Sequence, residues 1–331
     1  GGAGGGSPAG TPIEATKETW TWVPFDDAFC ADGSPTGIGV NLTDKSKRVL
    51  FFLQGGGACW DEYTCYSGQF AVHIVGGYKE ADFTKEVTTS LTSGFLDRSD
   101  EMNPFKDYSF VYVPYCTGDV HAGDNVAAYK TKETMHVGHK NMAAYLKRLV
   151  PTLKDKDRVF LSGVSAGGYG AAFNWWHVQQ AFGDVRVDLI DDSGTPLTPG
   201  YANATFAAQQ RESWNLDATL PPGCEECKED TSALLPFYAK TFTDHRGALL
   251  SYTQDTVISQ FNLIDTDKFA EGLDQVAKDL IDPHPNLHYF FVGGKGHVLM
   301  GDPTLATNGV TVKQWLTQMV SDDAAWASQH P

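Results

Sequence analysis

Residues 158–172 read Arg158-Val-Phe-Leu-Ser-Gly-Val-Ser-Ala-Gly-Gly-Tyr-Gly-Ala-Ala172, and this stretch decides the interpretation of the chain. The apolar run at 159–161 predicts a buried strand, and residues 170–180 predict a helix. Between them, Gly163-Val-Ser-Ala-Gly167 fits the G-x-S-x-G turn that lifts a serine nucleophile above a sheet. Glycines suit this turn because a bulky neighbour would block the strained serine backbone. Ser165 is therefore the predicted nucleophile, and the alternative is a Gly-rich turn without chemistry.

Apolar runs and helical patterns alternate along the rest of the chain, which predicts an α/β fold with a mostly parallel central sheet and helices on both faces. Strands are predicted at 20–25, 37–41, 48–53, 109–114, 185–190 and 288–292, and helices at 135–153 and 310–319. Residues 200–250 have weaker periodicity and are interpreted as a cap or insertion. Because no second linker interrupts the pattern, residues 16–331 are expected to form a single catalytic domain.

The first residues, 1–15, are rich in glycine and are expected to form a flexible tether outside the fold. Such a segment fits what remains after removal of a signal peptide, a tether to a cell-surface anchor, or an artificial extension. Six cysteines, an even number, indicate three disulfides and an oxidising compartment. A zinc site or a redox motif at Cys224-Glu-Glu-Cys227 is the less favoured alternative. We expect a secreted, extracellular or periplasmic protein.

The charge balance excludes one class of partner. The 25 basic and 41 acidic residues give a formal net charge of −16, whereas nucleic-acid binding requires a basic surface. No apolar run approaches the roughly 20 residues that span a bilayer. The sequence therefore predicts no nucleic-acid partner and no transmembrane segment, and a monomer is expected.

A serine nucleophile needs a histidine base, and His297 is the favoured candidate. It lies in Gly293-Gly-Lys-Gly-His-Val-Leu, just beyond the last predicted strand. Of the other late histidines, His288 opens a predicted strand, His284 lies between two prolines, and His330 is at the terminus.

The acid that orients this histidine stays open on these arguments. Asp191 and Asp192 follow the strand after Ser165, whereas Asp255 lies nearer to His297 in the chain. Any of these aspartates could instead cap a helix.

An oxyanion hole needs backbone N–H groups aimed at the developing charge. Ala166 follows the nucleophile and supplies one such group, while Gly55, Gly56 and Gly57 follow a buried strand, as a donor loop of this kind does. A flexible turn is the alternative interpretation of the three glycines.

Aromatic residues near this loop could line a sugar-binding cleft or pack around a disulfide, and the sequence leaves both open: Trp60, Tyr63 and Tyr66. Tyr169, beside Ser165, is a second candidate pocket residue. The pairs His136/His139 and His284/His288 could suggest metal binding, but we interpret them as surface histidines. No metal and no organic cofactor are expected.

Taken in order, these segments resemble the Notum/pectin acetylesterase family of α/β-hydrolases, and the chain looks like a bacterial-type member. Five segments carry the resemblance: Phe29-Cys-Ala-Asp-Gly-Ser-Pro-Thr-Gly, Leu53-Gln-Gly-Gly-Gly-Ala-Cys-Trp, Tyr115-Cys-Thr-Gly-Asp, Ser162-Gly-Val-Ser-Ala-Gly-Gly and Asp191-Asp-Ser-Gly. The chain departs from the family pattern at Gln54, where glutamate is common, and at Ala58, where plant members have tryptophan.

The resemblance implies further assignments. It points to Asp255 as the acid, because the family acid lies in a segment similar to Tyr252-Thr-Gln-Asp-Thr-Val-Ile. It implies oxyanion donors at Gly56, Gly57 and Ala166, and the disulfides Cys30–Cys116, Cys59–Cys65 and Cys224–Cys227.

The resulting expectation is a secreted serine carboxylesterase that removes short acyl groups, such as acetyl, from a polysaccharide such as pectin. The alternatives are an esterase for longer lipid, protein-acyl or polyester substrates, and a non-catalytic carbohydrate-binding protein on the same fold.

Overall fold

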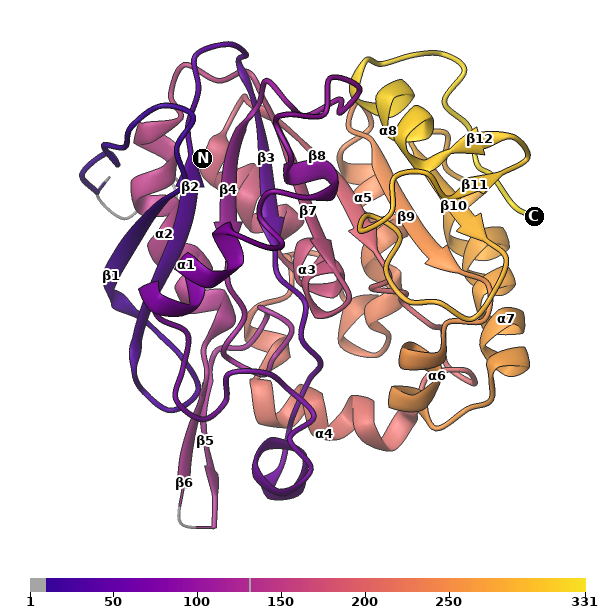
Figure 1. Cartoon of the computed structure of the whole chain (residues 1–331). Coiled ribbons are helices and arrows are strands. Elements are labelled where there is room, and N and C mark those ends of the chain that lie inside the picture. The colour runs from indigo at the N-terminus through magenta and orange to yellow at the C-terminus, as the bar shows by residue number, and fades with distance from the viewer. Residues whose placement is uncertain (1–9, 131) are drawn as a thin grey trace.

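The central element is an eight-stranded sheet, seen in a computed structural model that describes residues 10–130 and 132–331. The strand order is β1-β2-β4-β3-β7-β8-β9-β10 (Figure 1). β1 and β2 are antiparallel additions at one edge, and all strands from β4 to β10 run parallel. This confirms the predicted mostly parallel sheet. The strands are β1 Thr21–Phe29, β2 Pro35–Asn41, β3 Arg48–Leu53, β4 Ser109–Val113, β7 Arg158–Val164, β8 Arg186–Asp192, β9 Gly247–Tyr252 and β10 Leu287–Val292.

The central strands β3 and β4 are nearly continuous apolar runs because both faces of the sheet are covered there. In β3, Phe51 joins the core beneath α2 (Gly138–Thr152), α3 (Ala166–Phe182) and α5 (Leu234–Thr241). Its neighbour Leu50 points the other way, into the core beneath α1 (Glu80–Val87) and α8 (Val312–Val320). The predicted helices on both faces are thus confirmed.

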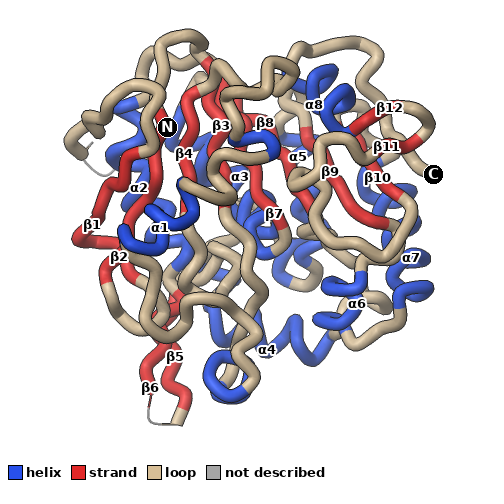
Figure 2. The backbone as a smooth tube through the Cα atoms, in the orientation of Figure 1, coloured by secondary structure: helices blue, strands red, loops and turns tan. Residues whose placement is uncertain are grey.

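Several of the remaining elements lie at the carboxyl ends of the strands. The connection 54–79 and helix α4 (Ala204–Trp214) lie together there (Figure 2), and the hairpin β5–β6 projects below them (Figure 1). The other elements are β5 Asn125–Tyr129, β6 Lys132–His136, α6 Thr256–Asn262, α7 Thr266–Gln275, β11 Ala306–Thr307, β12 Val310–Thr311 and the short helical turns η1 Tyr63–Ser67, η2 Gly94–Leu96, η3 Leu216–Ala218, η4 Glu226–Lys228, η5 Thr231–Ala233 and η6 Val276–Ile281.

Several element boundaries differ from the sequence expectations, including the start of the predicted helix 310–319, where residues 310–311 form β12 and α8 begins at Val312. The predicted helix 135–153 begins too early. Residues 132–136 form β6, and α2 starts only at Gly138. The segment predicted as a cap at 200–250 contains α4 and α5, but its end belongs to the central strand β9. The apolar run of β9 is too short to predict a strand from the sequence. Residues 247–252 form a strand because they pair with β8 on one side and β10 on the other and are buried between them.

The predicted tether is partly described. Residues 1–9 lie outside the described residues, but residues 10–15 lie against α2. The Gly10 N–H donates to the Lys147 carbonyl at 2.9 Å, and the Ile13 N–H donates to Thr152 Oγ1 at 2.7 Å. Ile13 is buried, so this part of the segment packs on the fold.

Three disulfides cross-link the chain, with the pairing that the family resemblance implies. Cys30–Cys116 joins the region after β1 to the region after β4, across 86 residues of sequence. Cys59–Cys65 and Cys224–Cys227 close short loops. Among the described residues, no helix has both the length and the apolar character needed to cross a bilayer.

Candidate active site

Ser165 sits in the turn between β7 and α3, in a conformation that few residues adopt. Its φ is 55° and its ψ is −121°, a strained combination for a residue with a side chain. A Cβ on Gly163 would lie 2.1 Å from the Gly167 carbonyl oxygen, and one on Gly167 would lie 2.1 Å from the Leu53 carbonyl oxygen. Both glycines are therefore required by packing.

The glycine loop after β3 lies directly beside this turn. A Cβ built on Gly55 would come within 3.1 Å of the Ser165 Cβ. The loop pairs with the segment around Ala71: the Val72 N–H donates to the Gly56 carbonyl at 2.9 Å, and the Ala58 N–H donates to the Phe70 carbonyl at 3.2 Å. Among the residues that the structure describes, the N–H groups of Gly56 and Gly57 have no hydrogen-bond partner. They are free to bind an oxygen atom.

Asp255 and His297 are in direct contact. Asp255 is fully buried, and its Oδ2 lies 2.7 Å from His297 Nδ1. Its Oδ1 accepts the N–H groups of Val257 and Ile258 at 2.9 and 3.0 Å, so the same carboxylate caps α6. Because an ionised carboxylate only accepts, Nδ1 carries the hydrogen and the outer nitrogen, Nε2, is left as an acceptor.

Asp192 has a different role, which its place in the sequence does not predict. Its carboxylate accepts the N–H groups of Leu299 and Met300 at 2.7 to 3.0 Å, and so holds the chain just beyond His297. Its backbone carbonyl accepts the Ser165 N–H at 2.7 Å. Asp192 therefore ties the serine turn and the histidine loop to one residue. Burial raises the pKa of its carboxyl to about 6.

Asp191, the other candidate acid, contacts neither Ser165 nor His297 through a hydrogen bond. Its Oδ1 accepts the Gly194 N–H at 2.9 Å, while its Oδ2 is buried and has no partner among the described residues. Burial raises the pKa of this carboxyl well above its usual value.

The two candidate pocket residues are anchored by hydrogen bonds. The Tyr169 hydroxyl donates to the Thr195 carbonyl at 2.7 Å, and burial raises its pKa. Trp60 is only 2% exposed; its Nε1 donates to Gln209 Oε1 at 3.0 Å, and its ring packs on Phe206. Trp60 therefore packs under α4 and presents no open face in this structure.

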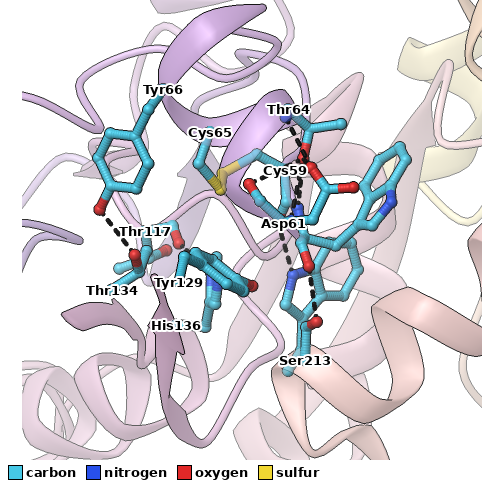
Figure 3. Close-up of a disulfide and its surroundings, with 12 residues drawn as sticks. Cys59, Asp61, Thr64, Cys65, Tyr66, Thr117, Tyr129, Thr134, His136 and Ser213 are labelled. Carbon is cyan, nitrogen blue, oxygen red and sulfur yellow. Dashed lines mark hydrogen bonds between the residues drawn. A yellow bond between two sulfur atoms is a disulfide. The ribbon is translucent and has the colours of Figure 1, made fainter. Parts of the chain in front are cut away.

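Hydrogen-bonded polar side chains lie around the Cys59–Cys65 disulfide (Figure 3), which also packs in a small apolar cluster with Ala71 and Ile74. The Tyr66 hydroxyl lies 2.7 Å from Thr134 Oγ1, so this ring packs beside the disulfide, whereas Tyr63 is 61% exposed.

The prediction that His136 is a surface histidine is wrong. It is fully buried beside that disulfide (Figure 3), where Nδ1 donates to the Thr117 carbonyl at 2.8 Å and Nε2 accepts from the Tyr129 hydroxyl at 2.9 Å. Cys59, Cys65 and His136 form a cluster of metal-type ligand atoms within 4.8 Å, but the two sulfurs are bonded to each other. The predicted helix placed His136 on a surface; its true place on β6, against the disulfide loop, buries it.

A cavity of about 220 Å³ lies next to the glycine loop, the Ser165 turn and the His297 loop. Its walls include one sequence neighbour of each: Gln54 before the glycine loop, Val164 before Ser165 and Val298 after His297. Most of the other lining side chains are apolar, including Leu91, Phe95 and Met300. A cavity of about 460 Å³ lies at the opposite, amino ends of β8 and β10, among Arg186, Arg246 and His288, so size alone does not mark the site.

A family model described as Pectinacetylesterase matches residues 17–245 of the chain. The chain belongs to the pectinacetylesterase family. This is a family of carboxylic ester hydrolases that also includes the Notum proteins. The matched pectinacetylesterase region contains the glycine loop and Ser165 but ends before Asp255 and His297, so those two residues rest on the geometry described above.

Curated relatives of this pectinacetylesterase-family chain are palmitoleoyl-protein carboxylesterases. NOTUM of Mus musculus is 28% identical over 172 residues, which is 50% of this chain and 33% of the relative. The notum2 protein of Xenopus laevis is 32% identical over 148 residues, covering 44% and 29%. NOTUM of Homo sapiens is 29% identical over 172 residues, covering 50% and 34%. The chain thus spans about a third of the length of the curated relatives it matches.

Proposed function

We propose that this protein is a serine carboxylesterase in which Ser165, His297 and Asp255 act as the catalytic triad. The observation that carries the proposal is the 2.7 Å contact between His297 and the buried Asp255, with the chain just beyond His297 anchored to Asp192, whose carbonyl also accepts the Ser165 N–H. A buried carboxylate that orients a histidine is the part of a catalytic triad that activates a serine hydroxyl.

In the proposed acylation step, Ser165 Oγ attacks the ester carbonyl carbon while His297 Nε2 accepts the hydroxyl proton. The bond from that carbon to the alcohol oxygen then breaks, and His297 returns the proton to the departing alcohol. Asp255 keeps the hydrogen on Nδ1 and stabilises the imidazolium that forms between these two transfers.

Water completes the cycle by the same route. It gives a proton to His297 and attacks the acyl carbon, and the bond to Ser165 Oγ breaks as that oxygen takes the proton back. In both steps the N–H groups of Gly56, Gly57 and Ala166 bind the negative oxygen of the tetrahedral intermediate. Removing one such donor typically lowers kcat by about 10²- to 10³-fold.

The favoured substrate is a short acyl ester on a polysaccharide, with acetylated pectin as the leading example. The family model that matches residues 17–245 supports this choice. The three disulfides support an oxidising, extracellular or periplasmic location, where such a polymer is accessible.

A second candidate is hydrolysis of longer acyl esters. Two observations favour it: the curated relatives are palmitoleoyl-protein carboxylesterases, and the 220 Å³ cavity beside Val164 and Val298 is lined mainly by apolar side chains. An apolar cavity favours a hydrocarbon chain over an acetyl group, because each buried methylene contributes about 0.8 kcal/mol.

The test is hydrolysis of p-nitrophenyl esters, from acetyl to long acyl, by the wild type and by Ser165→Ala. A preference for acetyl would support the deacetylase, and release of acetate from acetylated pectin would then establish the polymer. A preference for long chains would favour the second candidate. Activity that survives Ser165→Ala, or a wild type that neither hydrolyses these esters nor reacts with a fluorophosphonate at Ser165, would contradict the proposal.

A further inference from the structure

Gln54 connects β3 to the glycine loop, and hydrogen bonds hold every polar atom of this residue. Its N–H donates to the Val113 carbonyl at 3.0 Å, and its carbonyl accepts from His121 Nε2 at 2.9 Å. In the side chain, Oε1 accepts the Tyr115 N–H at 2.9 Å, and Nε2 donates to Glu86 Oε1 at 2.8 Å. The residue immediately before Gly55 is therefore fixed at both backbone and side chain.

Glu86 comes from α1, which packs on the opposite face of the sheet from the serine helix α3. One of its oxygens accepts from Gln54, and the other accepts from the hydroxyls of Tyr78, at 2.8 Å, and Tyr112. Burial, with the negative charge of Glu86 adding to it, raises the pKa of Tyr78. Burial likewise raises the pKa of Tyr112. Both hydroxyls therefore remain donors, and Glu86 acts as an acceptor at both of its oxygens.

We propose that Glu86 is a positioning residue for catalysis: through Gln54 it holds the N–H groups of Gly56 and Gly57 where the oxyanion forms. The inference rests on the proposed function, in which those groups stabilise the tetrahedral intermediate. Three consecutive glycines have unusual backbone freedom, whereas oxyanion donors must be held within about 0.5 Å of their working position. The locked residue before the loop restrains its amino-terminal side, in addition to the pairing of the loop with residues 70–72.

The side chains of Gln54 and Glu86 form a complementary donor and acceptor pair, and this complementarity can be tested by exchanging them. A carboxylate at position 54 could still accept the Tyr115 N–H, but it would face the carboxylate of Glu86, and like charges this close disfavour each other. Exchanging the two groups restores every bond. The new amide at position 86 donates to the new carboxylate at position 54, and its oxygen accepts from Tyr78 and Tyr112.

The experiment compares Gln54→Glu with the exchanged variant Gln54→Glu/Glu86→Gln on p-nitrophenyl acetate. In Gln54→Glu we expect kcat to fall about 10- to 100-fold with KM changed less than threefold, because misplacement of about 1 Å costs on the order of 10²-fold. In the exchanged variant we expect kcat to return to within about threefold of the wild type. Gln275→Glu, at the end of α7 and outside this network, adds the same charge as a control.

The outcomes separate this inference from the proposed function. If the wild type hydrolyses the ester and Ser165→Ala does not, the proposed function stands. If Gln54→Glu then keeps the wild-type kcat, or the exchange fails to restore kcat while thermal unfolding shows a wild-type Tm, the positioning role of Glu86 is wrong. Loss of kcat that follows loss of Tm in every variant would also overturn it, because the network would then serve folding alone.

Discussion

The Nδ1 atom of His297 lies 2.7 Å from Oδ2 of Asp255, although 42 residues separate them in the chain. The sheet explains the contact. β9 and β10 are parallel neighbours, and Tyr252 pairs with Val292 at their carboxyl ends. Asp255 follows the first of these residues and His297 follows the second, so both leave the sheet at the same edge.

The variant Asp255→Asn should lose activity but keep its stability. An amide cannot stabilise the imidazolium and disturbs the tautomer of His297, so we expect kcat to fall about 10²- to 10⁴-fold. The amide oxygen can still accept the N–H groups of Val257 and Ile258, so the cap of α6 is preserved. Steady-state kinetics and thermal unfolding check the two expectations.

Asp265→Asn is the matched control, because Asp265 caps α7 in the same way through the Lys268 N–H. It should leave both kcat and Tm close to wild type. Wild-type kcat in Asp255→Asn would show that Asp255 is not the acid of the triad.

The two short disulfides should differ in their effect on catalysis. Cys59 follows the glycine loop, and the loop that it closes is held to α4, where Trp214 Nε1 donates to the Cys59 carbonyl at 2.9 Å. In the double variant Cys59→Ser/Cys65→Ser, the free energy of unfolding should fall by about 2 kcal/mol. Its kcat should also fall, because the oxyanion donors are no longer held in position. Denaturant unfolding and initial rates measure the two effects.

Cys224→Ser/Cys227→Ser removes a disulfide that closes a comparably short loop, far along the chain from the glycine loop at 55–57. We expect it to lose stability by a similar amount and to keep its kcat at temperatures where it is folded. Equal losses of kcat in the two double variants would argue that the Cys59–Cys65 loop has no specific link to the oxyanion donors.

Asp191 should make stability depend on pH. Burial, and then the charge of Asp192, raise the pKa of its carboxyl in the folded state. The folded protein therefore keeps a proton that the unfolded chain releases near pH 4, so the stability that Asp191 contributes is complete below about pH 4 and declines as the pH rises through the folded pKa. In Asp191→Asn this decline should be absent, since the amide cannot ionise.

The measurement is the free energy of unfolding of Asp191→Asn and the wild type between pH 4 and pH 8. The difference should move in favour of the variant as the pH rises. The exposed Asp184→Asn should track the wild type. A constant difference between Asp191→Asn and the wild type would refute the prediction.

Asp188 should be important for stability but not for chemistry. It is fully buried at the amino half of β8, where its oxygens lie 2.6 Å from Arg158 Nε and 2.8 Å from Arg186 Nε. Asp188→Asn removes a buried carboxylate from Arg158, which keeps its ion pair with Asp322 at 2.7 Å, so we expect a loss of about 1.5–3 kcal/mol. We expect a lower Tm and, where the variant is folded, a wild-type KM and kcat; a changed KM would show that this end of the sheet communicates with the site.

Local sequence was sufficient for features that depend on near neighbours. The continuous apolar run at 48–53 predicted β3 because a strand covered on both faces needs apolar residues at every position. The glycines around Ser165 predicted a sharp turn because the backbone there leaves no space for a Cβ at Gly163 or Gly167. Both patterns act over a few residues, so they are visible in one dimension.

Tertiary structure alone decided which distant groups meet. Asp191 and Asp192 end β8, and Asp255 follows β9. Only the packing of β9 beside β10, in register, brings Asp255 onto His297, and only the folded loop after β10 brings Leu299 and Met300 to Asp192. The same holds for His136, which the fold buries beside the Cys59–Cys65 disulfide. Such contacts depend on strand order and register, which the residues around each group do not encode locally.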